Sequence, residues 1–224
     1  MNVLIACEES QRVCIEFRKQ GHNAFSCDLV ECSGGHPEWH IKQDVIPLLD
    51  GRCKFKTCDN KKHYVVGKWD LIIAHPVCTF LTVTGNRWFD TGKYGKKAWE
   101  RMNERNKAIS FFYKFVMADC QKIAIENPVG IMSVAYRKPD QIIQPYQFGD
   151  PYEKKTCLWL KGLSPLIYTK EVEPPKRLKF ESGKSMASWY YDLWRLPKEE
   201  RAKERSKTFP GIAKAMAEQW GCIL

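Results

Sequence analysis

Short apolar runs alternate with longer amphipathic stretches over the first half of the chain. Each run is a few residues long and ends beside a polar or acidic residue, which is typical of buried strands. We expect five such strands, at residues 2–6, 24–27, 40–43, 69–74 and 122–125. Segments 54–57 and 63–66 flank Asp59 and Asn60 and predict a hairpin.

Helical periodicity appears between these strands. Ser10 can cap a first helix, and Gly21 can end it. The inward-facing positions of this helix are Val13, Cys14 and Phe17. A second helix is predicted over 96–118, with apolar residues at Trp99, Met102, Ile109, Phe112, Phe115 and Val116. Strands that alternate with helices predict an α/β fold with a mostly parallel sheet and helices on both faces.

A third helix is predicted at the end of the chain, over about 211–220. Ile212, Met216 and Trp220 recur at four-residue spacing, so they are expected to be core positions of this helix. A length of 224 residues fits one domain, and we expect residues 1–224 to form it.

The composition narrows the class of protein. Apolar residues make up 44% of the chain, which is enough for a sizeable core and argues against disorder. No apolar run approaches the ~18 residues of a membrane span, and the N-terminus lacks the basic flank of a signal peptide. We therefore expect a soluble, cytoplasmic protein with no membrane partner, in which the ten cysteines are reduced.

The net charge of +10 is concentrated in two segments. Residues 84–114 hold eight Lys or Arg against three acids, and residues 161–207 hold twelve against seven. Aromatic residues are interleaved with these charges. Because cations bind phosphates and aromatic rings stack on bases, the pattern favours a nucleic-acid partner. The candidate nucleic-acid-binding residues are Arg87, Lys93, Lys96, Lys97, Arg137, Lys154 and Lys155.

Ligands of a parallel sheet bind beyond the carboxyl ends of its strands. The residues there include Cys7, Glu8 and Ser10 after the first strand, then Asp28 and Asp44 after the second and third. Acids after successive strands suit a nucleoside cofactor, because carboxylates accept hydrogen bonds from ribose hydroxyls and an adenine amine. A helix-capping or turn-forming Asp is the alternative for each.

The next two strand ends carry the groups with the most chemistry. The fourth strand is followed by Pro76, Val77 and Cys78, and the fifth by Glu126 and Asn127. At this point the chain resembles the S-adenosylmethionine-dependent DNA cytosine-5 methyltransferases, especially their short, phage-type members. Further stretches that carry the resemblance are 32–36, 144–150 and 208–213.

The resemblance implies a class I methyltransferase (Rossmann-like) fold and methylation of cytosine C5 in DNA. In this family a Pro-Cys supplies the nucleophile and a Glu-Asn supplies the acid, which implies Cys78 as nucleophile, Glu126 as acid and Asn127 as a loop-ordering residue. The cofactor would be S-adenosylmethionine, held by Cys7, Glu8, Ser10, Asp28, Asp44 and Pro76. The partner would be double-stranded DNA with its target base flipped out, in the host cytoplasm if the protein is phage-encoded.

The chain departs from the larger family in three places. The loop over residues 6–11 contains no glycine, Val77 splits the Pro-Cys dipeptide, and no long target-recognition domain is present. Residues 129–207 form a small basic elaboration that is the remaining candidate for sequence readout.

Three alternatives remain open from the residues. An amino-methyltransferase that acts on DNA or RNA bases would use the loop after the fourth strand to hold an exocyclic amine. A zinc site in the Cys/His-rich region 27–63 is a second alternative. The third is a methyltransferase-like protein that binds nucleic acid without catalysis.

Overall fold

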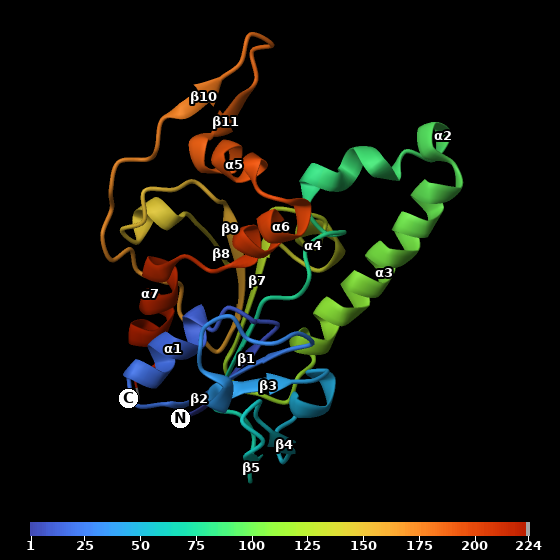
Figure 1. The fold of residues 1–224 in the computed structure, drawn as a ribbon. Helices are drawn as coiled ribbons and strands as arrows, with labels where there is room; N and C mark the ends of the chain where they lie inside the picture. Colours follow the sequence, from blue (N-terminus) through green and yellow to red (C-terminus); the bar gives the residue numbers. More distant parts are fainter. Residues whose placement is uncertain (223–224) are drawn as a thin grey trace.

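The computed structural model describes residues 1–222 and is organised around a seven-stranded sheet (Figure 1). The strands lie in the order β3-β2-β1-β6-β7-β9-β8. Their bounds are β1 Asn2–Ala6, β2 Asn23–Asp28, β3 His40–Lys42, β6 Leu71–Ala74, β7 Ile123–Pro128, β8 Gln141–Ile143 and β9 Thr156–Lys161. The five strands predicted from the sequence are all present, each within a few residues of its expected bounds.

Five of these strands run parallel, from β3 through β2, β1 and β6 to β7. Strand β9 pairs antiparallel with β7, and β8 pairs antiparallel with β9. One reversed strand inserted near the edge of an otherwise parallel sheet is the arrangement of the class I methyltransferase fold. The fold is therefore α/β and Rossmann-like, as predicted. Its topological switch point lies between β1 and β6, where the strand order reverses direction.

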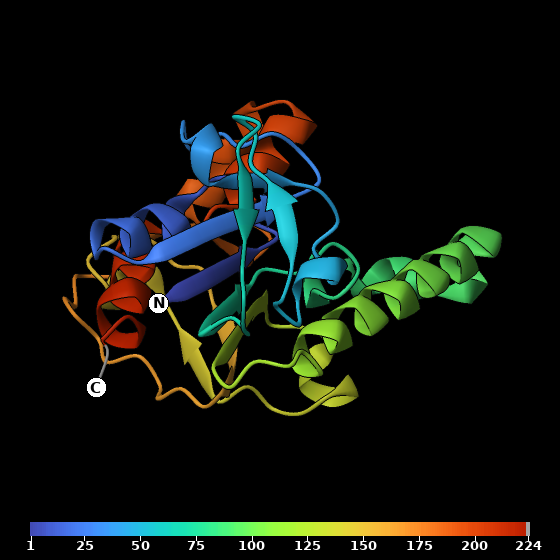
Figure 2. The same ribbon diagram turned by 90° about the horizontal axis from the view of Figure 1, so that it is seen from below.

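Helices cover both faces of the sheet (Figure 2). Alternate residues of β1 explain why: Val3 and Ile5 belong to a core with helices α1 (Arg12–Lys19) and α7 (Pro210–Trp220), whereas Leu4 and Ala6 belong to a second core. The second core includes Phe112 and Phe115 of helix α3, which spans Lys96–Val116. Ile212, Met216 and Trp220 of α7 are buried, which confirms them as core positions.

Two local predictions need correction. Ser10 does not cap α1, because Gln11 stands at the N-cap and the carboxylate of Glu8 accepts the backbone N–H groups of Val13 and Cys14 instead. In α3 the apolar pattern does not mark one continuous buried face. Trp99 is 60% exposed, since the first half of α3 extends away from the sheet (Figure 2).

The remaining elements lie at both edges of the sheet, with the hairpin at the amino end of β3, where the backbone N–H of Cys58 donates to the His40 carbonyl oxygen. The predicted hairpin is present as β4 (Lys54–Lys56) and β5 (Lys62–Tyr64). The loop after β6 contains a 3₁₀ helix, η3 (Val83–Phe89), and a short helix, α2 (Thr91–Tyr94). The other helices and strands are α4 Met132–Ala135, β10 Arg177–Lys179, β11 Ser185–Ala187, α5 Ser188–Asp192 and α6 Lys198–Ser206. The short 3₁₀ helices are η1 Pro37–Trp39, η2 Ile46–Leu48, η4 Pro145–Gln147 and η5 Leu193–Arg195. None of the helices in residues 1–222 combines the length and apolarity needed to cross a membrane.

Candidate active site

The loops that follow β6 and β7 are joined by two side-chain hydrogen bonds. Asn127 is buried, and its Nδ2 donates to the carbonyl oxygen of Pro76 at 2.8 Å. His75 Nδ1 lies 3.1 Å from Glu126 Oε2, and both side chains are almost completely buried. Because β6 and β7 are adjacent and parallel, their carboxyl ends deliver these four residues to one place.

Cys78 lies in the same group. Burial raises the pKa of its thiol above the usual value, and the charge of Glu126 raises it further. The cations Lys154 and Arg205 act in the opposite direction but do not outweigh these effects. The thiol is therefore protonated at neutral pH.

For the Glu126 carboxyl, the effects that lower the pKa outweigh the effect that raises it. Burial raises its pKa, but the hydrogen bond from His75 and the charge of Lys154 lower it more, so the pKa of this carboxyl ends below its usual value. A buried carboxylate is thus held ionised beside a protonated thiol. Between them, the two groups carry one proton that can move.

Buried polar atoms at this place have no partner within residues 1–222. They are His75 Nε2 and Asn127 Oδ1. Buried polar atoms in folded proteins almost always have a hydrogen-bond partner, so the exceptions call for an explanation, and a catalytic role or a bound ligand is one. The site therefore has unused hydrogen-bonding capacity beside Cys78.

The loop after β1 reaches the expected shape without glycine. Cys7 and Gln11 adopt φ values of 60° and 58°, which are left-handed conformations that glycine adopts most easily. A non-glycine residue there costs roughly 1–2 kcal/mol. The missing glycines are therefore replaced by strained residues that keep the turn.

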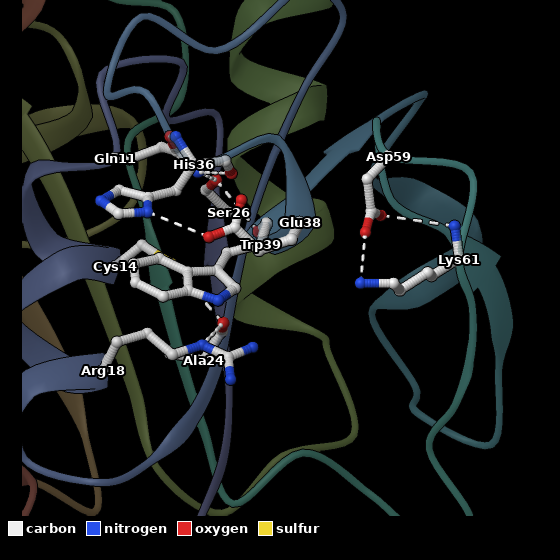
Figure 3. A network of polar contacts seen from close by, with 10 residues as sticks. All are labelled: Gln11, Cys14, Arg18, Ala24, Ser26, His36, Glu38, Trp39, Asp59 and Lys61. Carbon is white, nitrogen blue, oxygen red and sulfur yellow. Dashed lines mark hydrogen bonds and ion pairs between the residues drawn. The ribbon is translucent and has the colours of Figure 1, made fainter.

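Gln11 fastens this loop to the loop after β2, as the close-up in Figure 3 shows. Its Nε2 donates to the carbonyl oxygen of His36 at 2.9 Å, and its Oε1 accepts the backbone N–H of His36 at 3.1 Å. Gly34 packs so closely that an added Cβ would lie 2.7 Å from the Ser10 carbonyl oxygen. Residues 32–36, one of the stretches that carry the family resemblance, thus hold the loop after β1 in place.

Two acids of the first loop occupy different environments. Burial raises the pKa of Glu8 to about 7, although His75 and the N–H groups of Val13 and Cys14 act against this rise. Both carboxylate oxygens of Glu9 are buried and have no hydrogen-bond partner within residues 1–222; Lys203 Nζ is 3.7 Å away. Glu9 is therefore ion-paired with Lys203 but accepts no hydrogen bond from the described residues, so its carboxylate can still accept one from a cationic ligand; S-adenosylmethionine carries an ammonium group and a sulfonium. The residues present therefore fit this cofactor.

The acids after β2 and β3 form turns. Asp28 Oδ1 accepts the backbone N–H of Leu29 at 2.7 Å, and Asp44 Oδ1 accepts that of Ile46 at 3.0 Å. Both carboxylates act on the buried thiol of Cys7 and raise its pKa, after burial itself. The structure thus groups Asp28, Asp44 and Cys7, and each Asp has a second oxygen for which no hydrogen bond is formed within residues 1–222.

Ser10 lines a separate cavity of about 360 Å³ at the start of α1, together with Arg12, Ser33 and Lys207. Two loops and the last helix meet there. Of the predicted cofactor-binding residues, Ser10 is the one that faces this cavity.

The predicted nucleic-acid-binding residues divide into three sets. Arg87, Lys93, Lys96 and Lys97 lie on η3, α2 and the start of α3. Lys154 lies beside Cys78 and Glu126, and its Nζ donates to the carbonyl oxygen of Arg205 at 2.9 Å; its neighbour Lys155 is exposed.

Arg137 stands apart from the other six. Its guanidinium forms a two-pronged ion pair with Asp140, at 2.8 and 2.6 Å, and also donates to the carbonyl oxygen of Leu160. These contacts fasten the chain between α4 and β9. A contact of Arg137 with nucleic acid stays a prediction.

The zinc alternative finds no support in the part of the chain that the structure describes. No group of three or more His, Cys, Asp or Glu side chains in residues 1–222 is arranged to hold a metal ion. His63 and Thr57 hydrogen-bond each other within the hairpin, and His40 bonds Ser26. All ten cysteines are free thiols.

Four residues of the site were not predicted from the sequence. His75 and Glu9 are next in sequence to residues that were predicted. Their positions at the ends of strands were the sequence signal that could have identified them. Tyr190 and Arg205 lie close to Cys78, since the charge of Cys78 raises the pKa of Tyr190 and the charge of Arg205 lowers the pKa of both. No sequence pattern connects residues so far apart.

Comparison with known proteins leaves the family open. No protein-family model matches the chain, and no curated protein matches it. Among solved structures, it is similar to a candidate DNA modification methyltransferase encoded within a prophage of E. coli, with 14% identity and a TM-score of 0.46. The similarity covers 88% of this chain and 56% of that protein, so this chain spans little more than half of its length.

Proposed function

We propose that the protein methylates cytosine C5 in DNA, with Cys78 as nucleophile and Glu126 as the acid. The observation that carries this proposal is the burial of a thiol and an ionised carboxylate together at the carboxyl ends of two adjacent parallel strands. Addition of a thiolate to C6 of cytosine makes C5 nucleophilic, and a carboxyl group at N3 offsets the charge that develops on the ring.

Each proton has a place in this scheme. As the sulfur of Cys78 bonds to C6, the thiol proton passes by way of the Glu126 carboxylate to N3 of the target base. C5 of the resulting enamine then takes the methyl group, whose bond to the sulfonium sulfur breaks and leaves a neutral thioether. The C5 proton then passes to solvent base, the C5–C6 double bond re-forms, the thiolate leaves, and the N3 proton returns to Glu126.

Other residues position this pair. His75 holds Glu126 by one oxygen, which leaves the other oxygen for N3 of the base. Asn127 ties the Pro76 carbonyl and so fixes the start of the loop that carries Cys78. Lys154 adds a positive charge beside both reacting groups, which favours the thiolate once it forms.

S-adenosylmethionine would supply the methyl group as an electrophilic sulfonium. We propose that the orphaned Glu9 carboxylate binds its ammonium group and that Asp28 and Asp44 bind its nucleoside. Cys7, Glu8 and Pro76 would line the space between them, and Ser10 would lie at its margin. Support for this placement comes from the left-handed turn at Cys7 and Gln11, which keeps the shape that glycine gives related loops.

Nucleoside mass spectrometry tests the proposal. Unmodified duplex DNA is incubated with the protein and S-adenosylmethionine, digested and analysed. The proposal predicts 5-methylcytosine. If the methyl group is found on an exocyclic amine, the protein is an amino-methyltransferase and the C5 proposal is wrong. If the protein binds DNA but no methylated nucleoside forms, it is a non-catalytic nucleic-acid-binding protein.

A further inference from the structure

The loop after β6 and the first half of α3 form an arm, defined here as residues 83–107. Figure 1 shows the arm projecting from the sheet on the right, with α2 at its tip. A cavity of about 950 Å³ lies within the arm, between η3, α2 and α3. This volume falls in the range of about 300–1,000 Å³ that small-molecule sites occupy. The Cys78–Glu126 pair does not line it, so it is a separate site.

Aromatic rings and cations form the walls of this cavity. The rings are Phe80, Trp88 and Tyr94, and the cations are Lys97, Arg101 and Lys107. Trp88 is 42% exposed although it is a large apolar side chain. Its ring meets that of Tyr94 at 5.1 Å between centroids, with planes 48° apart, which leaves ring surface uncovered. Exposed rings of this kind stack on nucleobases irrespective of sequence.

The charges around the cavity favour an anion. Two acids also line it, but Glu104 is paired with Lys107 at 2.6 Å and Glu100 with Lys96 at 3.8 Å. Lys97 forms no ion pair within residues 1–222. Arg87 and Lys93 add positive charge beside the rings, each placed over its aromatic neighbour at 4.7 and 5.5 Å. Unpaired cations next to exposed rings match a nucleotide, which presents a base and a phosphate together.

Arg101 connects this cavity to the loop of the active site. Its Nη2 donates to the carbonyl oxygen of Thr79 at 3.3 Å, next to Cys78 in the sequence, and its guanidinium stacks on the Phe80 ring. Gly85 makes room for it, because an added Cβ would lie 2.8 Å from Nη2. Arg101 Nε is buried and has no partner within residues 1–222, so this wall keeps a free donor.

We propose that the arm cavity binds one unpaired nucleotide of the nucleic-acid substrate, with its base on Trp88 and its phosphate on Lys97. This inference rests on the proposed function, since it assumes a nucleic-acid substrate, and it adds a second base-binding site to that of the target. The nucleotide bound in the arm cavity belongs either to the strand that carries the target base or to the complementary strand.

Binding of a fluorescein-labelled oligothymidylate, measured by anisotropy at low salt without cofactor, tests the inference. Trp88→Ala is expected to weaken binding on the order of 10-fold, because stacking on one ring contributes about 1–3 kcal/mol. Trp88→Phe keeps an aromatic face and is expected to retain most of the affinity. Trp99→Ala is the matched control: Trp99 is another exposed tryptophan of the arm, does not line the cavity and should leave binding unchanged.

The outcomes separate the two proposals. Wild-type affinity in Trp88→Ala, or an equal loss in Trp99→Ala, would overturn the arm site and leave the proposed methylation untouched. If the wild-type protein binds neither the oligothymidylate nor duplex DNA, the nucleic-acid substrate itself is wrong and both proposals fail. A loss in Trp88→Phe as large as in Trp88→Ala would also overturn stacking as the basis of the site.

Discussion

The two halves of the carboxyl edge use their acidic residues in different ways. After β2 and β3, Asp28 and Asp44 accept hydrogen bonds from the backbone of the turns that follow them. At the centre, after β1 and near the end of β7, Glu9 and Glu126 are largely buried and pair with side chains, Glu9 with Lys203 and Glu126 with His75. The outer acids help to fold their loops. The central acids are desolvated, so their charge is unfavourable unless a side chain or a ligand pairs with it.

This contrast shows where function is concentrated. A protein retains unpaired buried groups where a ligand completes them. The orphaned atoms of Glu9, His75 and Asn127 all lie in the central half, beside the switch point of the sheet. We therefore expect changes in the central half to alter activity strongly and changes in the outer half to have smaller effects.

The largest effect is expected from Cys78→Ala. Without the thiol no bond to C6 forms, so methylation is abolished while DNA affinity is retained. Glu126→Gln keeps the shape of the side chain but cannot move a proton, and it should lower the rate on the order of 10²- to 10⁴-fold. Cys222→Ala, at an exposed cysteine, is the control and should be fully active. Normal turnover by Cys78→Ala would end the C5 mechanism.

The next effect is a pH dependence of stability from Glu8. Its pKa is raised from 4.5 to about 7, so between these values the folded protein holds a proton that the unfolded chain has lost. The free energy of unfolding therefore falls as pH rises through this window, by on the order of 3 kcal/mol, and this contribution is constant above it.

Glu8→Gln removes this titration. Urea unfolding at a series of pH values from 4.5 to 8 should show a shallower decline in the variant than in the wild type. Glu171→Gln, at an exposed position, should follow the wild-type curve. Identical slopes for the wild type and Glu8→Gln would show that Glu8 does not titrate in this range.

A smaller effect is expected from Glu9→Gln on the binding of S-adenosylmethionine. Loss of a charge-assisted contact to the ammonium group should weaken affinity about 10-fold, because hydrogen bonds to charged groups contribute about 1.5–3 kcal/mol. Calorimetry measures this directly. Sinefungin, which carries an extra amine, provides a second ligand whose affinity should fall in parallel. Unchanged affinity for both ligands would remove Glu9 from the cofactor site.

The smallest effect is expected from Asp44→Asn. The amide oxygen can still accept the N–H of Ile46, so the turn is retained and stability should change by less than about 1 kcal/mol. Loss of one exposed acceptor should reduce cofactor affinity by a few-fold at most. A larger loss than for Glu9→Gln, measured in the same calorimetric series, would reverse the contrast between the two halves.

The parallel part of the fold was predictable because its signals are local. Buried strands such as 2–6 and 69–74 are short apolar runs, and their order along the chain fixes which carboxyl ends meet. The cap of α1 was not predictable in the same way: Ser10 fits the pattern, but Glu8 reaches back to the free N–H groups and displaces it. Strands β8 and β9 lie among charged residues and gave no clear periodicity.

The candidate site likewise contains some residues that local sequence patterns predict and others that they do not. The positions of Cys78 and Glu126 at strand ends were predicted from the apolar runs before them, whereas their roles came from the family resemblance. Tyr190 and Arg205 reach the site from the basic C-terminal segment, whose path over the sheet edge no local pattern encodes (Figure 1). The ion pair of Arg137 with Asp140 was missed because a charge in sequence does not reveal its partner.

Covalent trapping tests the central claim most directly. A DNA duplex that carries 5-fluorocytosine is incubated with the protein and S-adenosylmethionine, because a fluorine at C5 cannot leave as a proton and the thiol adduct cannot break down. The account predicts a stable protein–DNA adduct that peptide mass spectrometry places on Cys78 and that Cys78→Ala does not form. Methylation of the unmodified duplex without any adduct on Cys78 would contradict it.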